Sequence, residues 1–190
     1  MTNKLFMLLL GCRPAGRNTE QHDIFFGIGT SLKDLIPAIR KTWPEAKGNI
    51  HIDAWRTVTN VNGYSIEVNE TGTAKNGEAL FFINLGGYKE NEFDEFHYKL
   101  LLVADNLENA KAQAKKTAFY KHVTLEKSSS HPNATSHIDD KYGVDVDDAH
   151  RVDDILPVSY KEKFRLHISL QEQVLPEDEL HLGYFRLTDL

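Results

Sequence analysis

A glutamate and a histidine stand two positions apart at the start of a predicted strand, as Glu20 and His22. Because side chains at i and i+2 of a strand point to the same side, the carboxylate and the imidazole should share one face. Such a pair can bind a metal ion or act as an acid–base pair. The same spacing recurs as Glu95 and His97. The recurrence also suits a structural pair that closes a loop in each place, so both interpretations stay open.

A second polar pair with this spacing, His51 and Asp53, falls on a later predicted strand. If the protein uses a metal, we predict that its ligands are Glu20, His22, His51 and Asp53, and that the reaction is metal-assisted hydrolysis. The leading interpretation has no resident metal and no cofactor. Whether the protein is an enzyme is left open at this point.

Asp53 is also followed by Arg56, and the same pattern recurs as Asp148 and Arg151. We expect each pair to form an ion pair that fixes a strand end. Arginine also holds a carboxylate or phosphate in a bidentate fork, so Arg56 is a candidate ligand-binding residue.

The loop before Glu20 carries Arg13 and Arg17 among small residues, with Cys12 beside them. Two cations and exposed backbone amides can form a cradle for an anion, although the ending of a Walker loop is missing. A solvated surface loop is the alternative. Neighbouring cations lower a thiol pKa, which makes Cys12 a candidate nucleophile. The leading hypothesis is a cytoplasmic protein that binds a small anionic ligand through loop 11–23, with these contacts: Arg13, Arg17, Gln21, His22 and Arg56.

Composition narrows the class of protein. The chain has 190 residues, a formal net charge of −6 and a single cysteine. One cysteine excludes a disulfide framework and a multi-cysteine zinc site within the chain. No basic block supports nucleic-acid binding, and no apolar run approaches the ~20 residues of a membrane span. A homo-oligomer and a protein-interaction module without a small ligand remain open alternatives.

An internal repeat organises the chain. At an offset of 75 positions, residues 5–11 fall on 80–86, and eight of the 37 positions from 5 to 41 are identical. The match resumes at an offset of 95, where residues 53–56 fall on 148–151. The second copy therefore carries about 20 extra residues, near 128–147, with the composition of a loop.

We therefore predict repeat unit 1 at residues 1–77 and repeat unit 2 at 78–190, with the insertion near 128–147, joined in one compact double-unit domain. Each unit is predicted as ββαββ, and the two units as related by a pseudo-twofold axis. The fold class is α+β, with mixed or antiparallel sheets and helices on one face. The repeat also favours a strand over a lipoprotein signal at residues 4–10, because their counterpart lies deep inside the chain.

Short apolar runs predict strands at residues 4–10, 24–28, 50–58, 64–68, 122–125, 164–170 and 182–187. Ser31 with Asp34 predicts the start of the first helix, and Pro37 counts against that helix. In the second copy, Asp105 with Glu108 predicts the start of the equivalent helix.

The stretch Gly11-Cys12-Arg13-Pro14-x-Gly16-Arg17-x-x-Glu20-Gln21-His22-Asp23-x-Phe25-Phe26-Gly27-Ile28-Gly29, with His51-Ile52-Asp53-Ala54-Trp55-Arg56, resembles the bacterial family called domain of unknown function 1543. The resemblance implies a short domain in one or two copies per chain, here two tandem copies, and it brings no assigned activity. The second copy departs from the pattern at four polar positions, which become Tyr88, Glu92, Phe96 and Tyr98.

Overall fold

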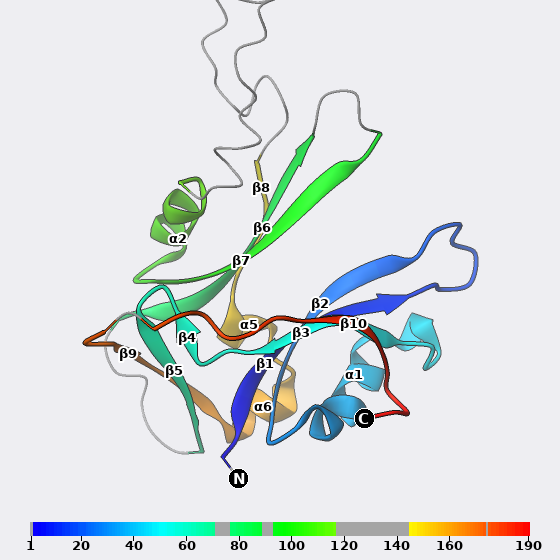
Figure 1. The fold of residues 1–190 in the computed structure, drawn as a ribbon, viewed down its shortest axis with the longest axis horizontal. Helices are drawn as coiled ribbons and strands as arrows, with labels where there is room; N and C mark the ends of the chain where they lie inside the picture. Colours follow the sequence, from blue (N-terminus) through cyan, green and yellow to red (C-terminus); the bar gives the residue numbers. More distant parts are fainter. Residues whose placement is uncertain (1, 71–76, 89–92, 117–144, 174) are drawn as a thin grey trace, which may run out of the picture. The chain divides into compact units, whose positions relative to one another are not determined.

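The computed structural model describes residues 2–70, 77–88, 93–116, 145–173 and 175–190 (Figure 1). The chain divides into two compact units. Unit 1 comprises Met1–Asn76 and Asp153–Leu190, and unit 2 comprises Gly77–Val152. All the strand pairings of the described residues are antiparallel, so the α+β prediction is confirmed.

The main sheet of unit 1 has the strand order β10-β3-β1-β2. Its strands are β1 (Lys4–Cys12), β2 (Gln21–Gly29), β3 (His51–Thr57) and β10 (His181–Arg186). Strands β1 and β2 form a hairpin, and the C-terminal strand β10 returns to pair with β3 (Figure 1). The sheet therefore joins segments from both ends of the chain.

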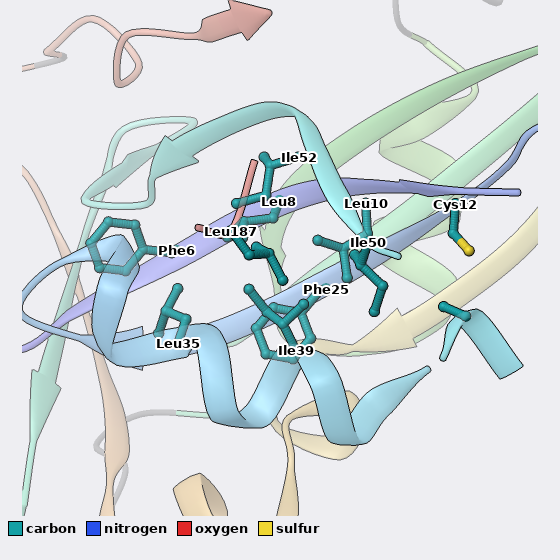
Figure 2. Close-up of a cluster of buried hydrophobic side chains, with 11 residues drawn as sticks. Phe6, Leu8, Leu10, Cys12, Phe25, Leu35, Ile39, Ile50, Ile52 and Leu187 are labelled. Carbon is teal, nitrogen blue, oxygen red and sulfur yellow. The ribbon is translucent and has the colours of Figure 1, made fainter. Parts of the chain in front are cut away.

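One face of this sheet is packed against a helical segment. The alternate residues Phe6, Leu8, Leu10 and Cys12 of β1 are buried, whereas Met7 and Leu9 are half-buried. The buried side chains pack with residues from β2, β3 and the helices, including Phe25, Leu35, Ile39 and Ile52 (Figure 2). This period of two leaves the opposite face of β1 available for polar neighbours.

The helical segment consists of a 3₁₀ helix, η1 (Leu32–Leu35), the α-helix α1 (Ile36–Thr42), and a second 3₁₀ turn, η2 (Pro44–Ala46). The Asp34 carboxylate accepts hydrogen bonds from the backbone amides of Thr30 and Ser31, as the predicted capping pattern requires. Pro37 does not break the helix, because α1 begins only at Ile36 and the proline falls in its first turn. A first-turn proline costs no intrahelical hydrogen bond.

Unit 1 also holds a small second sheet with the order β4-β5-β9. Its strands are β4 (Asn60–Val61), β5 (Tyr64–Asn69) and β9 (Arg165–Leu170), and the helices α5 (Val152–Ile155) and α6 (Val158–Lys163) precede β9. The pairing of Ile66 with Ile168 buries both side chains. Residues 164–170, which we expected in the second copy, therefore form a strand of unit 1, because β5 offers their apolar side chains a partner.

Unit 2 contains the sheet β7-β6-β8 and one described helix. Its elements are β6 (Ala79–Tyr88), β7 (Glu95–Ala104), α2 (Leu107–Ala114) and β8 (Asp145–Arg151). The helix starts one residue later than predicted, because Asn106 is extended and its side chain accepts a hydrogen bond from the Asn109 amide at 2.9 Å. Residues 122–125 and most of the expected insertion lie outside the described residues.

Within each unit, the strands pair in corresponding registers. Gly11 faces His22 across the hairpin of unit 1, and Gly86 faces His97 across that of unit 2. The third strand of each sheet carries a register shift at the corresponding place, between Leu9 and Leu10 and between Asn84 and Leu85. These registers support the predicted duplication, which stays a prediction together with the division at residue 77 and the pseudo-twofold axis.

The same registers correct one detail of the alignment between copies. Gly11 faces His51 on β3, and Gly86 faces Asp145 on β8, so the offset between these strands is 94 and not 95. The counterpart of Asp53 is thus Asp147, and Asp148 stands at the position of Ala54. A shift of one residue matters because it moves a strand side chain to a different neighbourhood on the sheet.

Candidate functional site

Three neighbouring strands bring polar residues to the face of the main sheet opposite α1. Gly11 on β1 is paired with His22 on one side and His51 on the other. Directly paired residues of adjacent strands share a face, so both imidazoles stand over Gly11. Glu20, two residues before His22, and Asp53, two residues after His51, follow on the same face.

Gly11 leaves the room that this arrangement needs. A Cβ atom at this position would lie 2.3 Å from His51 Nε2 and 2.4 Å from Asp53 Oδ2. No real side chain tolerates contacts that short, so only glycine allows the imidazole and the carboxylate to settle over the strand. The sequence pattern alone does not reveal this role of the glycine.

A β-bulge also contributes to the site. The pairing of β1 with β3 skips from Leu9–Ala54 to Leu10–Ile52, which leaves Asp53 as the extra residue on β3. Bulges bend the strand locally and re-aim a side chain, and they are frequent beside functional sites. The bulge places the Asp53 carboxylate between the two imidazoles.

Four side chains converge here. His51 Nε2 lies 3.1 Å from Glu20 Oε1 and 3.2 Å from Asp53 Oδ1. His22 Nε2 lies 3.2 Å from Asp53 Oδ2 and 3.8 Å from Glu20 Oε2. Each imidazole nitrogen therefore faces both carboxylates, and the structure brings together all four residues predicted as metal ligands.

His51 is the buried member of the set, with 7% of its side chain exposed, against 43% for His22 and 44% for Glu20. Its Nε2 atom is buried and makes no hydrogen bond, and the same holds for Asp53 Oδ2. The nearby carboxylate oxygens thus stand close to the His51 ring without the geometry of a hydrogen bond. Buried polar atoms without a partner are costly and rare, so these two need an explanation.

Strand β10 fixes the orientation of the His51 ring. The ring of Tyr184 stacks on it with centroids 4.2 Å apart and an angle of 30° between the planes. Three residues earlier on β10, the ring of His181 stacks on Trp55 of β3, with ring centroids 3.9 Å apart. The sequence did not indicate a role for Tyr184, because this residue lies far from His51 in the chain and belongs to no motif.

The predicted anion loop is only partly assembled. Arg13 and Arg17 are exposed, and Arg13 Nε donates to the backbone carbonyl of Arg17 at 3.3 Å. Gln21 pairs with Cys12 across the hairpin, so it points away from the face that carries His22. Its amide donates to the backbone carbonyl of Glu20 at 3.1 Å. The structure does not bring Gln21 together with His22.

Two further sequence hypotheses are contradicted. Cys12 is fully buried on the core side of β1, and burial, assisted by the charge of Glu20, raises the pKa of its thiol. An inaccessible thiol with a raised pKa is no nucleophile. The expected ion pair between Asp53 and Arg56 does not form, because Arg56 Nη1 binds Glu177 Oε2 at 2.7 Å while Asp53 faces the histidines.

In unit 2, Asp148 Oδ2 accepts a hydrogen bond from Asn84 Nδ2 at 3.2 Å, and the expected pair of Asp148 with Arg151 stays a prediction. Arg56 keeps little freedom for a ligand, since 11% of its side chain is exposed. Its role in ligand binding stays a prediction.

Part of the chain is similar to a known family of domains. Residues 17–68 match the model of a family described as Domain of Unknown Function (DUF1543). The matched segment contains Glu20, His22, His51 and Asp53. It lies within the predicted first copy, and the second copy stays a prediction from the repeat.

A solved structure, protein Il1583 from Idiomarina loihiensis, has a similar fold. Its TM-score is 0.63 at 23% sequence identity, over 97% of both chains. No curated protein matches the sequence. Among the described residues, no helix is both long and apolar enough to span a membrane.

Proposed function

We propose that unit 1 binds a divalent transition-metal ion through Glu20, His22, His51 and Asp53. The observation that carries the proposal is the buried Nε2 atom of His51, which stands between two carboxylates without a hydrogen bond. A neutral imidazole presents a lone pair at such a nitrogen, and a bound cation would satisfy it together with Asp53 Oδ2.

The donor set suits this interpretation. Two imidazoles and two carboxylates are ligands typical of zinc, manganese and iron. As metal ligands, two carboxylates supply two negative charges and neutral imidazoles supply none, so a divalent cation would balance the set. Without a cation, the like charges of two carboxylates that face the same imidazoles repel each other.

The competing structural interpretation predicts a different geometry around His51. If the histidines served only as partners of the carboxylates, a ring N–H of His51 should point at one oxygen and form a directed hydrogen bond. Instead, oxygens of two different residues lie at nearly equal distances from Nε2, 3.1 and 3.2 Å. Convergence of several donors on a common space is what coordination requires.

The site also suits hydrolysis. Glu20 and His22 are nearly half exposed, so solvent reaches one side of the cluster. A metal with an open position binds water there and lowers the pKa of that water to near neutrality. We therefore propose metal-assisted hydrolysis as the reaction class and keep a small anionic molecule as its ligand.

Metal titration of the full chain tests the proposal. We expect the purified protein to bind about one equivalent of Zn²⁺ or Mn²⁺ tightly in unit 1, measured by calorimetry after removal of metal with a chelator. His51→Ala should weaken this binding by at least about 100-fold, since even outer-shell changes cost 10- to 100-fold. His167→Ala, on β9 of the same unit, is the matched control and should bind normally. Unchanged binding by His51→Ala would refute the site.

A small anion bound through the loop is the second candidate. It is supported by Arg13 and Arg17, which are exposed and form no ion pair among the described residues. Exposed guanidinium groups are suited to hold the oxygens of a phosphate or carboxylate. Thermal shifts with inorganic phosphate, with and without metal, should shrink in the double variant Arg13→Ala with Arg17→Ala. An undiminished shift would exclude the loop as the binding element.

A further inference from the structure

We infer that unit 2 carries a second cation site, formed by Glu95, His97 and Asp147 and weaker than the site of unit 1. The inference goes beyond the proposed function, because it concerns other residues in another unit. These three residues each offer a ligand atom, and the three atoms lie within 4.8 Å of one another. His97 Nε2 is 3.3 Å from Asp147 Oδ2.

The strands of unit 2 build this cluster in the way that unit 1 builds its own. His97 pairs with Gly86 across the hairpin, and Glu95, two residues earlier, shares its face. Asp147 is the extra residue at the bulge between β6 and β8, since the pairing skips from Asn84–Asp148 to Leu85–Val146. A strand pair, a glycine and a bulge thus place the same three types of side chain on one face.

Gly86 shows how closely the carboxylate lies on the strand. A Cβ atom at this position would be 2.0 Å from Asp147 Oδ2 and 2.7 Å from Oδ1. The carboxylate is therefore folded down over the glycine and toward the imidazole. That placement corresponds to the position of Asp53 over Gly11.

A buried acceptor lies on the same face. Asn84, two residues before Gly86 on β6, is 9% exposed, and its Oδ1 atom is buried without a hydrogen bond. Its Nδ2 donates to Asp148 Oδ2. An acceptor of this kind can receive a hydrogen bond from a water molecule bound to the cation, which is the usual task of the shell outside the ligands.

The two clusters differ in one ligand and in burial. The register position of His51 is taken by Asp145, so an aspartate stands in unit 2 where unit 1 has its buried imidazole. His97 and Asp147 are 38% and 32% exposed. Three exposed ligands, two of them carboxylates, form a weaker and harder donor set than that of unit 1. It favours Mn²⁺ over zinc, with water completing the coordination.

Mn²⁺ titration of the metal-free full chain, followed by calorimetry and electron paramagnetic resonance, tests the inference. We expect two binding events per chain, a tight one and a weaker one. Asp147→Asn and, separately, His97→Gln should weaken only the weaker event, by at least about tenfold. Glu108→Gln, which changes an exposed carboxylate on helix α2 of the same unit, is the matched control and should leave both events unchanged.

The variants separate the two proposals. His51→Ala should remove the tight event and keep the weaker one. A single event that His51→Ala removes would overturn the second site and leave the first intact. A weaker event that Asp147→Asn abolishes, with no effect of His51→Ala, would overturn the first site and support the second. Two events unaffected by both Asp147→Asn and His97→Gln, in variants with wild-type circular dichroism, would overturn the inference.

Discussion

Replacing Gly11 by alanine should destroy the proposed metal site of unit 1 without removing any of its four side chains. Gly11 lies beneath His51 and Asp53, where an added Cβ would come within 2.3 Å of Nε2 and 2.4 Å of Oδ2. The added methyl group occupies the space into which the imidazole and the carboxylate now point. The perturbation therefore tests the geometry of the cluster separately from its chemistry.

The distances set the size of the effect. To reach an ordinary van der Waals contact of 3.4 Å, the two ligand atoms must each retreat by about 1 Å. Metal–ligand distances tolerate only about 0.2 Å. Two ligands are thus displaced beyond that tolerance, and we expect the metal affinity to fall by at least about 100-fold, or about 2.7 kcal/mol.

The cost to the fold should be smaller. The ring of His51 is buried and held by Tyr184, so it cannot simply rotate away, and overpacking of this kind costs about 1–3 kcal/mol. Alanine is better than glycine inside a strand by about 0.5–1 kcal/mol, which offsets part of that loss. The metal-free variant should remain folded.

Gly27→Ala is the matched control on the neighbouring strand β2. Its Cβ would lie 2.7 Å from Phe25 Cε1 and 2.9 Å from a Leu35 methyl group, in the core and away from the cluster. Urea unfolding should show both variants destabilised, whereas calorimetry with Zn²⁺ should show lost affinity in Gly11→Ala alone. If Gly11→Ala bound Zn²⁺ as the wild type does, the four residues would not form the site.

Two further predictions concern other parts of unit 1. Burial alone would raise the pKa of Asp178, but hydrogen bonds from the amides and hydroxyls of Thr59 and its neighbours outweigh burial and lower that pKa. A lowered pKa contributes stability above the unfolded value of about 3.9, and this stability is lost as the pH falls through the folded pKa. Asp178→Asn should therefore cost about 1–2 kcal/mol in urea unfolding at pH 7 and much less at pH 3; an equal loss at both pH values would contradict this. The buried thiol of Cys12, with its raised pKa, should react with a thiol reagent at pH 8 at least about tenfold slower in the folded than in the unfolded protein, and equal rates would show that it is accessible.

Local patterns predicted most elements of the first sheet. The apolar run from Leu5 to Leu10 indicates a buried strand, and the structure has one there because alternate side chains pack on α1 while backbone groups pair on both sides. Ser31 and Asp34 predict the helix start, since that signal depends only on atoms within one turn. Such predictions succeed because the interactions that decide them are local in the chain.

Partner choice among distant strands was not predictable in this way. Residues 164–170 read as a strand of the second copy, yet β9 pairs with β5, where Leu166 and Ile168 are buried. Nothing in the alternation of a short apolar strand specifies which edge it will join. The same limit applies to Tyr184, whose contact with His51 exists only because β10 pairs with β3.

The sequence predicted the members of the unit 1 cluster as a set of residue types and left a structural pair and a metal site open for Glu20 and His22. Glu20 and His22 recur as Glu95 and His97, and recurrence by itself also suits a structural pair. The strand registers favour the metal site over the structural pair. What corresponds in both units is a glutamate, a histidine, an aspartate at a bulge and a glycine that leaves them room. A purely structural pair does not require glycine, because two side chains on neighbouring strands can also meet above another small residue. Coordination of a metal instead requires open space where the ligand side chains converge, so glycine is needed in each unit that has these ligands.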